Sequence, residues 1–255
     1  MISVTILTKN NQSTIASTLE SLRSFSEVLV FDTGSSDHTL KIAASFPNVT
    51  IKKGEFLGFG LTHNQASSLA KYDWILSIDA DESLSQELVS EIKTLGLDTS
   101  CVYNLKRFNF LENKHIKCCA GWHPDSIIRL YHRKQTRFTD DWVHEKVLSD
   151  GLKVITLKYP IHHTPYENID SFLRKMQIYS SLFAEQHFLR KKSSFFIALF
   201  HSWSCLFKNL ILKKGLFGGR LGWFISLYNA QTTFYKYIKL AEKNKKGLTC
   251  KNLRK

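Results

Sequence analysis

Short apolar segments alternate with segments of helical periodicity over the first hundred residues, and this alternation constrains the fold more than any other feature. Strands are expected at Ile2–Leu7, Glu27–Phe31, Val49–Ile51 and Trp74–Ile78. Helices are expected from about Ile15, near Leu40, over Leu61–Ala70 and over Leu84–Leu95. Such alternation predicts βαβ units and a parallel sheet. A chain of 255 residues with 43% apolar content can bury the core of such an α/β domain, and this composition excludes disordered and fibrous classes.

The pattern changes after about residue 100. Looser strands are expected at Val102–Phe110, Ile127–Tyr131 and Val154–Leu157. Their irregular connections predict an antiparallel extension of the sheet. From Ile169 to about Glu242 the chain predicts helices rich in aromatic residues and lysine. We therefore expect an α/β domain over residues 1–167 and a helical, basic segment over residues 168–255.

The positive charge is confined to that last segment. Residues 1–169 contain 18 Lys and Arg against 19 Asp and Glu, whereas residues 170–255 contain 17 against 3. This asymmetry predicts a near-neutral catalytic domain followed by a cationic docking segment. The five cysteines form no C-x-x-C pair and are odd in number, which favours a reducing compartment. Because the N-terminus begins directly in a strand pattern, no secretory signal is expected and we place the chain in the cytoplasm.

Polar clusters follow three of the predicted parallel strands. They contain Thr8 and Asn10 after the first strand, Asp32, Gly34 and Ser35 after the second, and Asp79 and Asp81 after the fourth. Ligands of open α/β sheets bind at the carboxyl ends of the strands, so these clusters predict a site there. Of the Asp79/Asp81 pair, one carboxylate can bind a sugar hydroxyl and the other a divalent cation that bridges phosphates. Alternatively, Asp81 or Glu82 only caps the helix that follows, and Asp32 only orders a turn.

Three motifs together resemble the successive motifs of family 2 glycosyltransferases in residue type, order and spacing. They are ISVTILTKN at Ile2–Asn10, VFDTGSSDHT at Val30–Thr39 and WILSIDADE at Trp74–Glu82. Further segments are similar to the branch that adds a sugar, typically glucose, to the inner core of lipopolysaccharide. These segments are Gly121–Asp125, Arg129–Tyr131, Val143–Glu145, His163–Tyr166 and Gly215–Gly222.

The resemblance implies a GT-A fold, a nucleotide-diphosphate sugar donor such as a UDP-hexose, a Mg²⁺ or Mn²⁺ ion, and inversion at the anomeric carbon. The donor-binding residues that it implies are Thr8, Asn10, Asp32, Gly34, Ser35, Asn64, Asp79 and Arg129. It implies Asp81 as a metal ligand, with His163 as a second ligand or a structural histidine. Arg129 either binds phosphate or pairs with a buried carboxylate. His63 stands where the branch more often has lysine, so its role stays open.

Inverting transfer also requires a base that takes the proton of the acceptor hydroxyl. The candidates are Asp125, Asp140, Asp141 and Glu145. Glu145 is preferred because Val143–Glu145 matches the branch motif and follows a loop; the alternative is a surface pair with Lys146. Asp140 and Asp141 come next, because family 2 enzymes often use an acidic pair near this position.

The C-terminal segment contains two apolar runs, Ser194–Phe207 and Leu221–Tyr228, and neither reaches the ~18 uninterrupted apolar residues that a spanning helix needs. Cations separate the runs at Lys208, Lys213, Lys214 and Arg220. This composition predicts helices that lie in a membrane surface, with their cations on anionic lipid. The acceptor that the resemblance implies would make this the cytoplasmic face of the inner membrane. Alternatively, their apolar faces pack on the catalytic domain or on a second subunit.

The predicted function is therefore inverting, metal-dependent transfer of a hexose, from UDP-glucose, to the heptose or Kdo of the lipopolysaccharide inner core. A different lipid-linked or capsular glycan is an alternative acceptor. A basic nucleic-acid-binding module is an alternative of another class. It is disfavoured, and no nucleic-acid partner is expected, because the tail has no recognisable binding motif and the acidic strand ends would have no role.

Overall fold

The computed structural model describes residues 1–255 apart from 112–113, 120–121, 124, 143, 166–168 and 253–255, and apart from the side chains of 248–252. The chain divides into two compact units. The first comprises Met1–Phe110 and Asp125–Pro165, and the second comprises Leu111–Pro124 and Tyr166–Lys255. The boundary expected near residue 167 falls in a segment outside the described residues. Residues 111–124, which the sequence analysis assigned to the catalytic domain, group with the helical unit.

The first half of the first unit is a parallel sheet, as predicted. Its strands lie in the order β3 (Val49–Lys53), β2 (Val28–Asp32), β1 (Ile2–Thr8) and β4 (Trp74–Asp79). The helices between them are α1 (Ile15–Ser21), α2 (Thr39–Ala43) and α3 (Phe59–Ser68). Thr8 pairs with Asp32, and Leu7 pairs with Asp79. The register therefore brings the three polar clusters to one edge of the sheet.

The second half of the sheet is mixed. Strand β8 (Ser126–His132) runs antiparallel to both β4 and β6 (Cys101–Leu111), which confirms the expected antiparallel extension. Strand β6 also pairs in parallel with β9 (Lys153–Thr156) and β10 (Ile161–His163). Strand β10 pairs with β5 (Glu82–Leu84), placing His163 opposite Glu82.

Helix α4 (Gln86–Thr94) begins two residues later than predicted. Its N-cap is Ser85, whose side chain accepts a hydrogen bond from the amide of Leu88. The interpretation of Asp81 or Glu82 as the cap of this helix is therefore wrong. Asp81 and Glu82 instead lie at the edge of the sheet, between the end of β4 and the start of β5.

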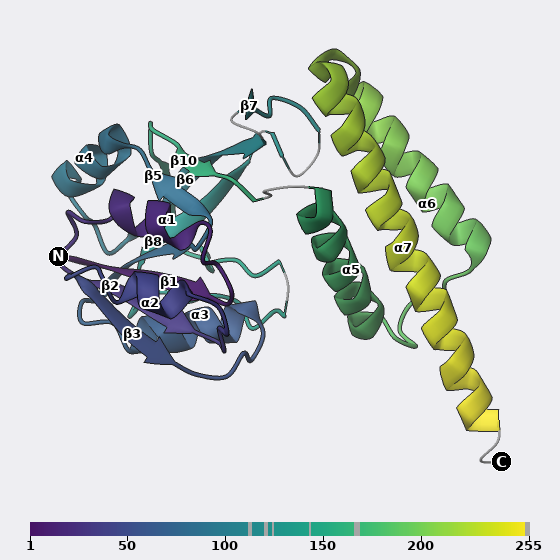
Figure 1. Cartoon of the computed structure of the whole chain (residues 1–255), viewed down its shortest axis with the longest axis horizontal. Helices are drawn as coiled ribbons and strands as arrows, with labels where there is room; N and C mark the ends of the chain where they lie inside the picture. The colour runs from purple at the N-terminus through teal and green to yellow at the C-terminus, as the bar shows by residue number, and fades with distance from the viewer. Residues whose placement is uncertain (112–113, 120–121, 124, 143, 166–168, 253–255) are drawn as a thin grey trace. The chain divides into compact units, whose positions relative to one another are not determined.

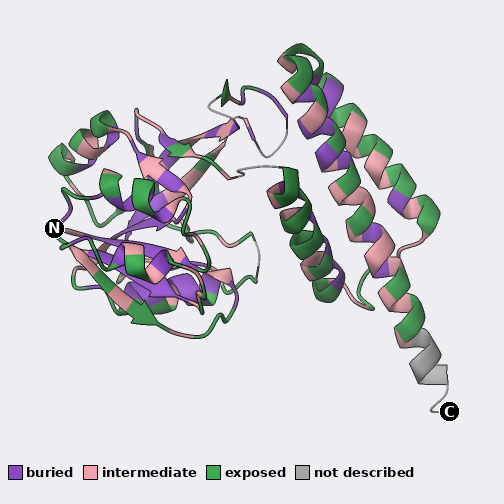
Figure 2. Ribbon diagram, viewed as in Figure 1, coloured by how far each residue is buried: buried purple, intermediate pink, exposed green. Residues whose placement is uncertain are grey.

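The core of the first unit lies on both faces of the parallel strands (Figure 2). All five residues of β2 are buried. This explains why Val28–Phe31 is continuously apolar rather than alternating, because a parallel sheet is covered by helices on both sides. Val4, Ile6, Leu76 and Ile78 are fully buried as well.

The second unit is helical among its described residues, except for the two-residue strand β7 (Lys114–His115). Its helices are α5 (Ile169–Gln186), α6 (Phe195–Phe207), the π-helix η1 (Lys208–Leu212), the 3-10 helix η2 (Gly215–Gly218) and α7 (Gly219–Asn252). Trp122 stacks on Phe172 in a core that also contains Met176, Ile225 and Tyr228. The cysteines Cys118 and Cys119 belong to the same core.

Helix α6 and η1 form one continuous run, Phe195–Leu212, of 18 residues with a mean hydropathy of 1.5, and only 17% of it is buried. By length and composition this run could cross a membrane. The sequence contains no uninterrupted apolar run of this length; the helix reaches 18 residues because it continues through Lys208 and Asn209 and so gains Leu210–Leu212. Its exposed side chains include Phe196, Phe200, Trp203 and Phe207.

Close approach of backbone to backbone fixes the segment that precedes Glu145. The amide of Gly60 in α3 donates to the carbonyl of Asp141 over 3.1 Å, and a Cβ atom at Gly60 would lie 1.8 Å from the carbonyl oxygen of Thr139. We expect Gly60→Ala to lower the free energy of unfolding by roughly 1–3 kcal/mol, since the overlap is with backbone and cannot be relieved by a side-chain rotation. Urea unfolding followed by circular dichroism measures this change.

Gly96→Ala is the matched control, because a Cβ atom at Gly96 would meet nothing within 4 Å. Its effect should stay within about 0.5 kcal/mol. Equal midpoints for the two variants would show that the contact between α3 and residues 139–141 is not required for stability.

Candidate active site

The loops after β1 and β2 form one side of the site. Thr8 and Asp32 are almost completely buried. The Asp32 carboxylate accepts hydrogen bonds from the amides of Gly34 and Ser35, over 3.2 and 3.1 Å. Gly34 has a φ of 105°, a conformation that side chains disfavour. Asp32 therefore orders this turn, as one of the two interpretations of the sequence proposed. The same hydrogen bonds fix the Asp32 carboxylate at the edge of the sheet.

Asn10 joins the two loops. Its side-chain oxygen accepts a hydrogen bond from the amide of Ser36 over 2.8 Å, and its own amide donates to the hydroxyl of Ser35 over 3.0 Å. The structure thus brings Thr8, Asn10, Asp32, Gly34 and Ser35 into one hydrogen-bonded group. This group is rigid and polar, as a nucleoside site requires.

A cluster of two arginines and three carboxylates lies beside these loops. Glu82 is completely buried and accepts hydrogen bonds from Arg107 and Arg129, each over 3.1 Å. Arg129 also donates to Asp79, and the Arg107 Nε atom donates to Asp125 over 2.7 Å. We call these five residues the ion cluster. Buried charges are tolerated when each is paired and hydrogen-bonded, as here.

The ion cluster decides the state of Asp79. Burial alone would raise the pKa of this carboxyl, but the adjacent Arg129 and Arg107 guanidinium groups outweigh it and hold the pKa below its ordinary value. Asp79 thus stays ionised while its side chain is 34% exposed, so it can accept a hydrogen bond from a ligand hydroxyl. Arg129 itself is 5% exposed and pairs with buried carboxylates, the second of the two roles considered for it.

Asp81 and His163 come together although 82 positions separate them in the sequence. The Oδ1 atom of Asp81 lies 3.4 Å from the Nε2 atom of His163. On the other side of the ring, Nδ1 lies 2.6 Å from the Oδ1 atom of Asn109. The amide nitrogen of Asn109 donates to Asp125 over 3.3 Å, so its oxygen must face the histidine. Hydrogen bonding therefore places a proton on Nδ1, and Nε2 is the ring atom that faces Asp81.

This donor set fits a divalent cation. A carboxylate oxygen and an imidazole nitrogen lie 3.4 Å apart, and the other ring nitrogen is fixed by a hydrogen bond, as is usual for histidine ligands. Among the described residues no group of three or more His, Cys, Asp or Glu side chains could hold a metal alone. Two protein ligands nevertheless agree with sites in which substrate phosphates and water complete the shell.

Glu145 is half-buried, with 19% of its side chain exposed. Burial, with the nearby Asp79 carboxylate, raises the pKa of Glu145 above its ordinary value. Its Oε1 atom lies 3.9 Å from the Nε2 atom of His63. A raised pKa makes an ionised carboxylate a stronger proton acceptor, which suits a general base.

His63, whose role the sequence left open, is a buried neighbour of this base. Its ring stacks on Phe138 at 4.4 Å, and its Nδ1 atom lies 3.2 Å from the hydroxyl of Ser77. Burial lowers the pKa of His63 to about 4, so the ring is neutral at pH 7. It supports Glu145 by packing and adds no charge.

The other base candidates lie in different surroundings. Asp140 is exposed and pairs with Arg137, and this hydrogen bond lowers the pKa of its carboxyl. Asp141 is exposed, and its carbonyl holds Gly60. Asp125 is bound to Arg107. Glu145 is therefore the candidate whose surroundings best match a base.

Asn64 lies behind the segment that leads to Glu145. Its side chain exchanges two hydrogen bonds with the backbone of Phe138, over 2.9 and 3.0 Å. Asn64 therefore positions the backbone at Phe138, in the segment that leads to Glu145. Gly121, Pro124, Val143 and Tyr166 of the quoted motifs lie outside the described residues.

Sequence reasoning missed three residues of the site: Glu82, Arg107 and Asn109. For two of them the sequence contained an indication: Arg107 and Asn109 are two residues apart on β6, so their side chains lie on the same face of the sheet. Glu82 follows Asp79-Ala80-Asp81 directly, but nothing in the sequence shows that it is buried.

Comparisons with known proteins show which family the chain is similar to. The family model "Glycosyl transferase family 2" matches residues 3–109, which include β1 to β4 and most of β6. An uncharacterized glycosyltransferase of Rickettsia typhi is 30% identical over 256 residues, covering 94% of this chain and 87% of the relative. One of Rickettsia bellii is 29% identical over 265 residues, covering 98% and 88%.

The chain belongs to glycosyltransferase family 2. A mannosyltransferase of Pyrobaculum calidifontis, solved with GDP-Man and Mn²⁺, is similar in structure with a TM-score of 0.50 and 16% identity, covering 95% of this chain and 86% of its own. The fold of this glycosyltransferase is thus GT-A, followed by helices, as predicted. The family and the enzyme class predicted from sequence are confirmed, whereas the lipopolysaccharide branch stays a prediction.

Glu145→Gln should lower kcat by about two to four orders of magnitude, the usual contribution of a general base, with donor affinity little changed. The base must be ionised, so activity of the native enzyme should fall as pH decreases through the raised pKa of Glu145. This acid limb should lie above the ordinary range of glutamate and should disappear in the variant. Turnover measured against pH provides the check.

Asp140→Asn is the companion variant, because it removes a carboxylate from the same segment. We expect it to retain most of the activity. A full rate in Glu145→Gln together with a large loss in Asp140→Asn or Asp141→Asn would transfer the role of base to that pair.

Proposed function

We propose that this glycosyltransferase moves a hexose from a nucleotide-diphosphate sugar, UDP-glucose, to the heptose or Kdo of the lipopolysaccharide inner core, with inversion. The observation that carries the proposal is the half-buried Glu145 carboxyl with its raised pKa, beside the ionised Asp79 and the Asp81–His163 pair. One base and one separately positioned cation site are the parts that a single displacement needs.

In this proposal the rigid loops after β1 and β2 hold the nucleoside, and Asp79 accepts a hydrogen bond from the ribose or the donor sugar. Asp81 and His163 would hold Mg²⁺ or Mn²⁺. Such an ion, when bound, neutralises the charge of the leaving diphosphate. The bound nucleotide sugars of related folds are consistent with this donor class, as in the mannosyltransferase with GDP-Man.

Glu145 then accepts the proton of the acceptor hydroxyl. The hydroxyl oxygen forms a bond to the anomeric carbon as the bond from that carbon to the diphosphate oxygen breaks. A single displacement of this kind inverts the configuration. A carboxylate is a sufficient base because the hydroxyl becomes acidic only in the transition state.

A lipid-anchored acceptor is supported by the second unit. Its positive charge, its exposed aromatic side chains and the apolar run Phe195–Leu212 suit the surface of an anionic membrane. We therefore place the enzyme at the cytoplasmic face of the inner membrane. A soluble acceptor would give these features no role.

Asp81→Ala should abolish metal-dependent turnover and leave the fold intact. Asp150→Ala is the control, since Asp150 is exposed and distant in sequence from the site. Initial rates at increasing Mn²⁺ and thermal unfolding of both variants test this prediction. Near-normal activity of Asp81→Ala with Mn²⁺ would remove Asp81 from the metal site.

The donor and the acceptor are tested by release of UDP or GDP across a panel of nucleotide sugars, with rough lipopolysaccharide as the acceptor. We expect UDP-glucose to give the largest acceptor-dependent release. Preference for another sugar, or equal release without acceptor, would contradict the proposed substrates.

Membrane attachment should depend on four cations of the second unit. Replacing them by Gln should reduce sedimentation with anionic liposomes far more than donor hydrolysis, because each cation near such a surface contributes about 1 kcal/mol. The four are Lys208, Lys213, Lys214 and Arg220.

The control removes four exposed cations of the first unit, Lys41, Lys52, Lys53 and Lys153. Release of the native protein by high salt is expected for surface attachment. Release by detergent alone would indicate that Phe195–Leu212 inserts into the bilayer. Native protein that stays in solution beside anionic liposomes at low salt would contradict membrane attachment.

A further inference from the structure

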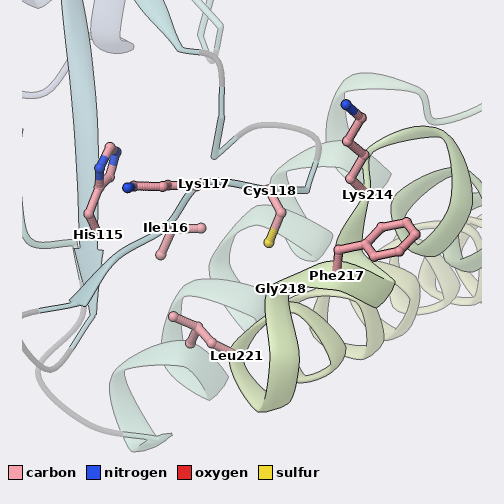
Figure 3. A pocket seen from close by; sticks show the side chains of 8 residues that line it. All are labelled: His115, Ile116, Lys117, Cys118, Lys214, Phe217, Gly218 and Leu221. Atoms are coloured by element: carbon pink, nitrogen blue, oxygen red, sulfur yellow. The ribbon is translucent and has the colours of Figure 1, made fainter.

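The second unit contains a cavity of about 350 Å³ that the catalytic site does not use (Figure 3). Residues 115–118 line one side, and Lys214, Phe217 and Leu221 lie across from them. Binding pockets of proteins begin at about this volume, at ~300 Å³. The cavity can therefore accept a small head group, but it is too small for a whole lipid.

The charge around the cavity favours an anion. Lys117 and Lys214 belong to its lining, and both are exposed. None of its eight lining residues is acidic. The sequence from residue 186 to residue 241 also contains no Asp or Glu, although it contains nine Lys and Arg. Repulsion among these cations is relieved by a bound anion, and phosphate is the anion that lysine commonly binds as a point charge.

Apolar side chains lie next to these cations. Phe217, in the lining, is 84% exposed, and the adjacent Leu216 is 45% exposed. Leu212, at the end of the apolar run, is 66% exposed. Large apolar side chains clustered beside a cationic cavity match a ligand that carries both an anionic group and hydrocarbon.

The backbone around the cavity is closely fitted. A Cβ atom at Gly218 would lie 2.5 Å from the sulfur of Cys118, and one at Gly222 would lie 2.1 Å from the carbonyl oxygen of Gly215. Lys214 has a φ of 57°, a left-handed conformation that is unusual for lysine. The backbone beside the cavity is therefore closely packed at Gly218 and Gly222.

We propose that this cavity binds the phosphomonoester head group of an anionic lipid, whose chains lie against Phe217, Leu216 and Leu212. Lys117 and Lys214, whose amino groups point in different directions in Figure 3, would turn toward the cavity to neutralise the phosphate. The inference deepens the proposed function, since it rests on a membrane-bound acceptor and assigns a specific lipid contact to the second unit. It would hold the enzyme at lipids that carry a terminal phosphate.

Isothermal titration of the full-length protein with monomeric dihexanoyl phosphatidic acid tests the proposal. We expect saturable binding, and Lys117→Gln with Lys214→Gln should weaken it by about tenfold or more, from ~1 kcal/mol per lost cation. The matched control, Arg190→Gln with Lys192→Gln, removes the same charge from exposed positions outside the cavity and should change binding less than about twofold. Lys117→Arg with Lys214→Arg should retain binding, which separates loss of charge from loss of fold.

Two further ligands identify what the cavity recognises. Inorganic phosphate should bind at least about tenfold more weakly than the lipid, and dihexanoyl phosphatidylcholine should bind more weakly as well. Equal affinity for inorganic phosphate would reveal a site for a free anion and overturn the proposal, as would equal affinity for phosphatidylcholine or equal losses in the cavity and control pairs.

Donor hydrolysis, measured separately, distinguishes the two proposals. A native protein that hydrolyses UDP-glucose but does not bind phosphatidic acid overturns the lipid site alone. A protein that binds the lipid but hydrolyses no nucleotide sugar overturns the proposed function alone.

Discussion

The active edge of this glycosyltransferase depends on the pairing of two buried guanidinium groups with three carboxylates. Asp79 comes from β4, Glu82 from β5, Arg107 from β6 and Arg129 from β8, so the ion cluster joins four strands. Without the arginines the carboxylates would repel one another, and without the carboxylates the two arginines would do so. The completely buried Glu82 forms ion pairs with both arginines. Removal of either arginine would leave an uncompensated charge in the interior. Because the arginines neutralise them, the carboxylates of Asp79, Glu82 and Asp125 can lie close together.

The same cluster gives neighbouring carboxyl groups opposite properties. Arginines hold Asp79 ionised, whereas burial raises the pKa of Glu145, so one side chain is suited to binding and the other to proton transfer. Asp125 extends the cluster to Asn109, whose side-chain oxygen holds Nδ1 of His163 and thereby orients Nε2 toward Asp81. Three hydrogen bonds, from Arg107 to Asp125, from Asn109 to Asp125 and between Asn109 and His163, therefore connect the ion cluster to a candidate metal ligand.

Most of the parallel sheet could be predicted from the sequence, since short continuous apolar runs such as Val28–Phe31, bounded by turn residues, are typical of buried strands. The position of Asp79 and Asp81 followed from their place after a strand. Strands β5 and β10, by contrast, have three residues each, too few for a period to be recognised. The burial of Glu82 depends on partners 25 and 47 residues away, which no local pattern contains. Likewise, the length of the apolar run depended on a helix that continues as a π-helix through Lys208.

The assignment of residues 111–124 to the second unit has a consequence for exchange of the C-terminal helices. The chain leaves the first unit after Phe110, returns at Asp125 and leaves again after Pro165, so three covalent connections join the units instead of one. Ile116 and Trp122 pack with Phe172 and Ile225, which follow much later in the sequence. A single recombination junction near residue 165 would separate these partners and expose their apolar surfaces. The C-terminal helices therefore cannot be exchanged at that junction without loss of packing inside the second unit.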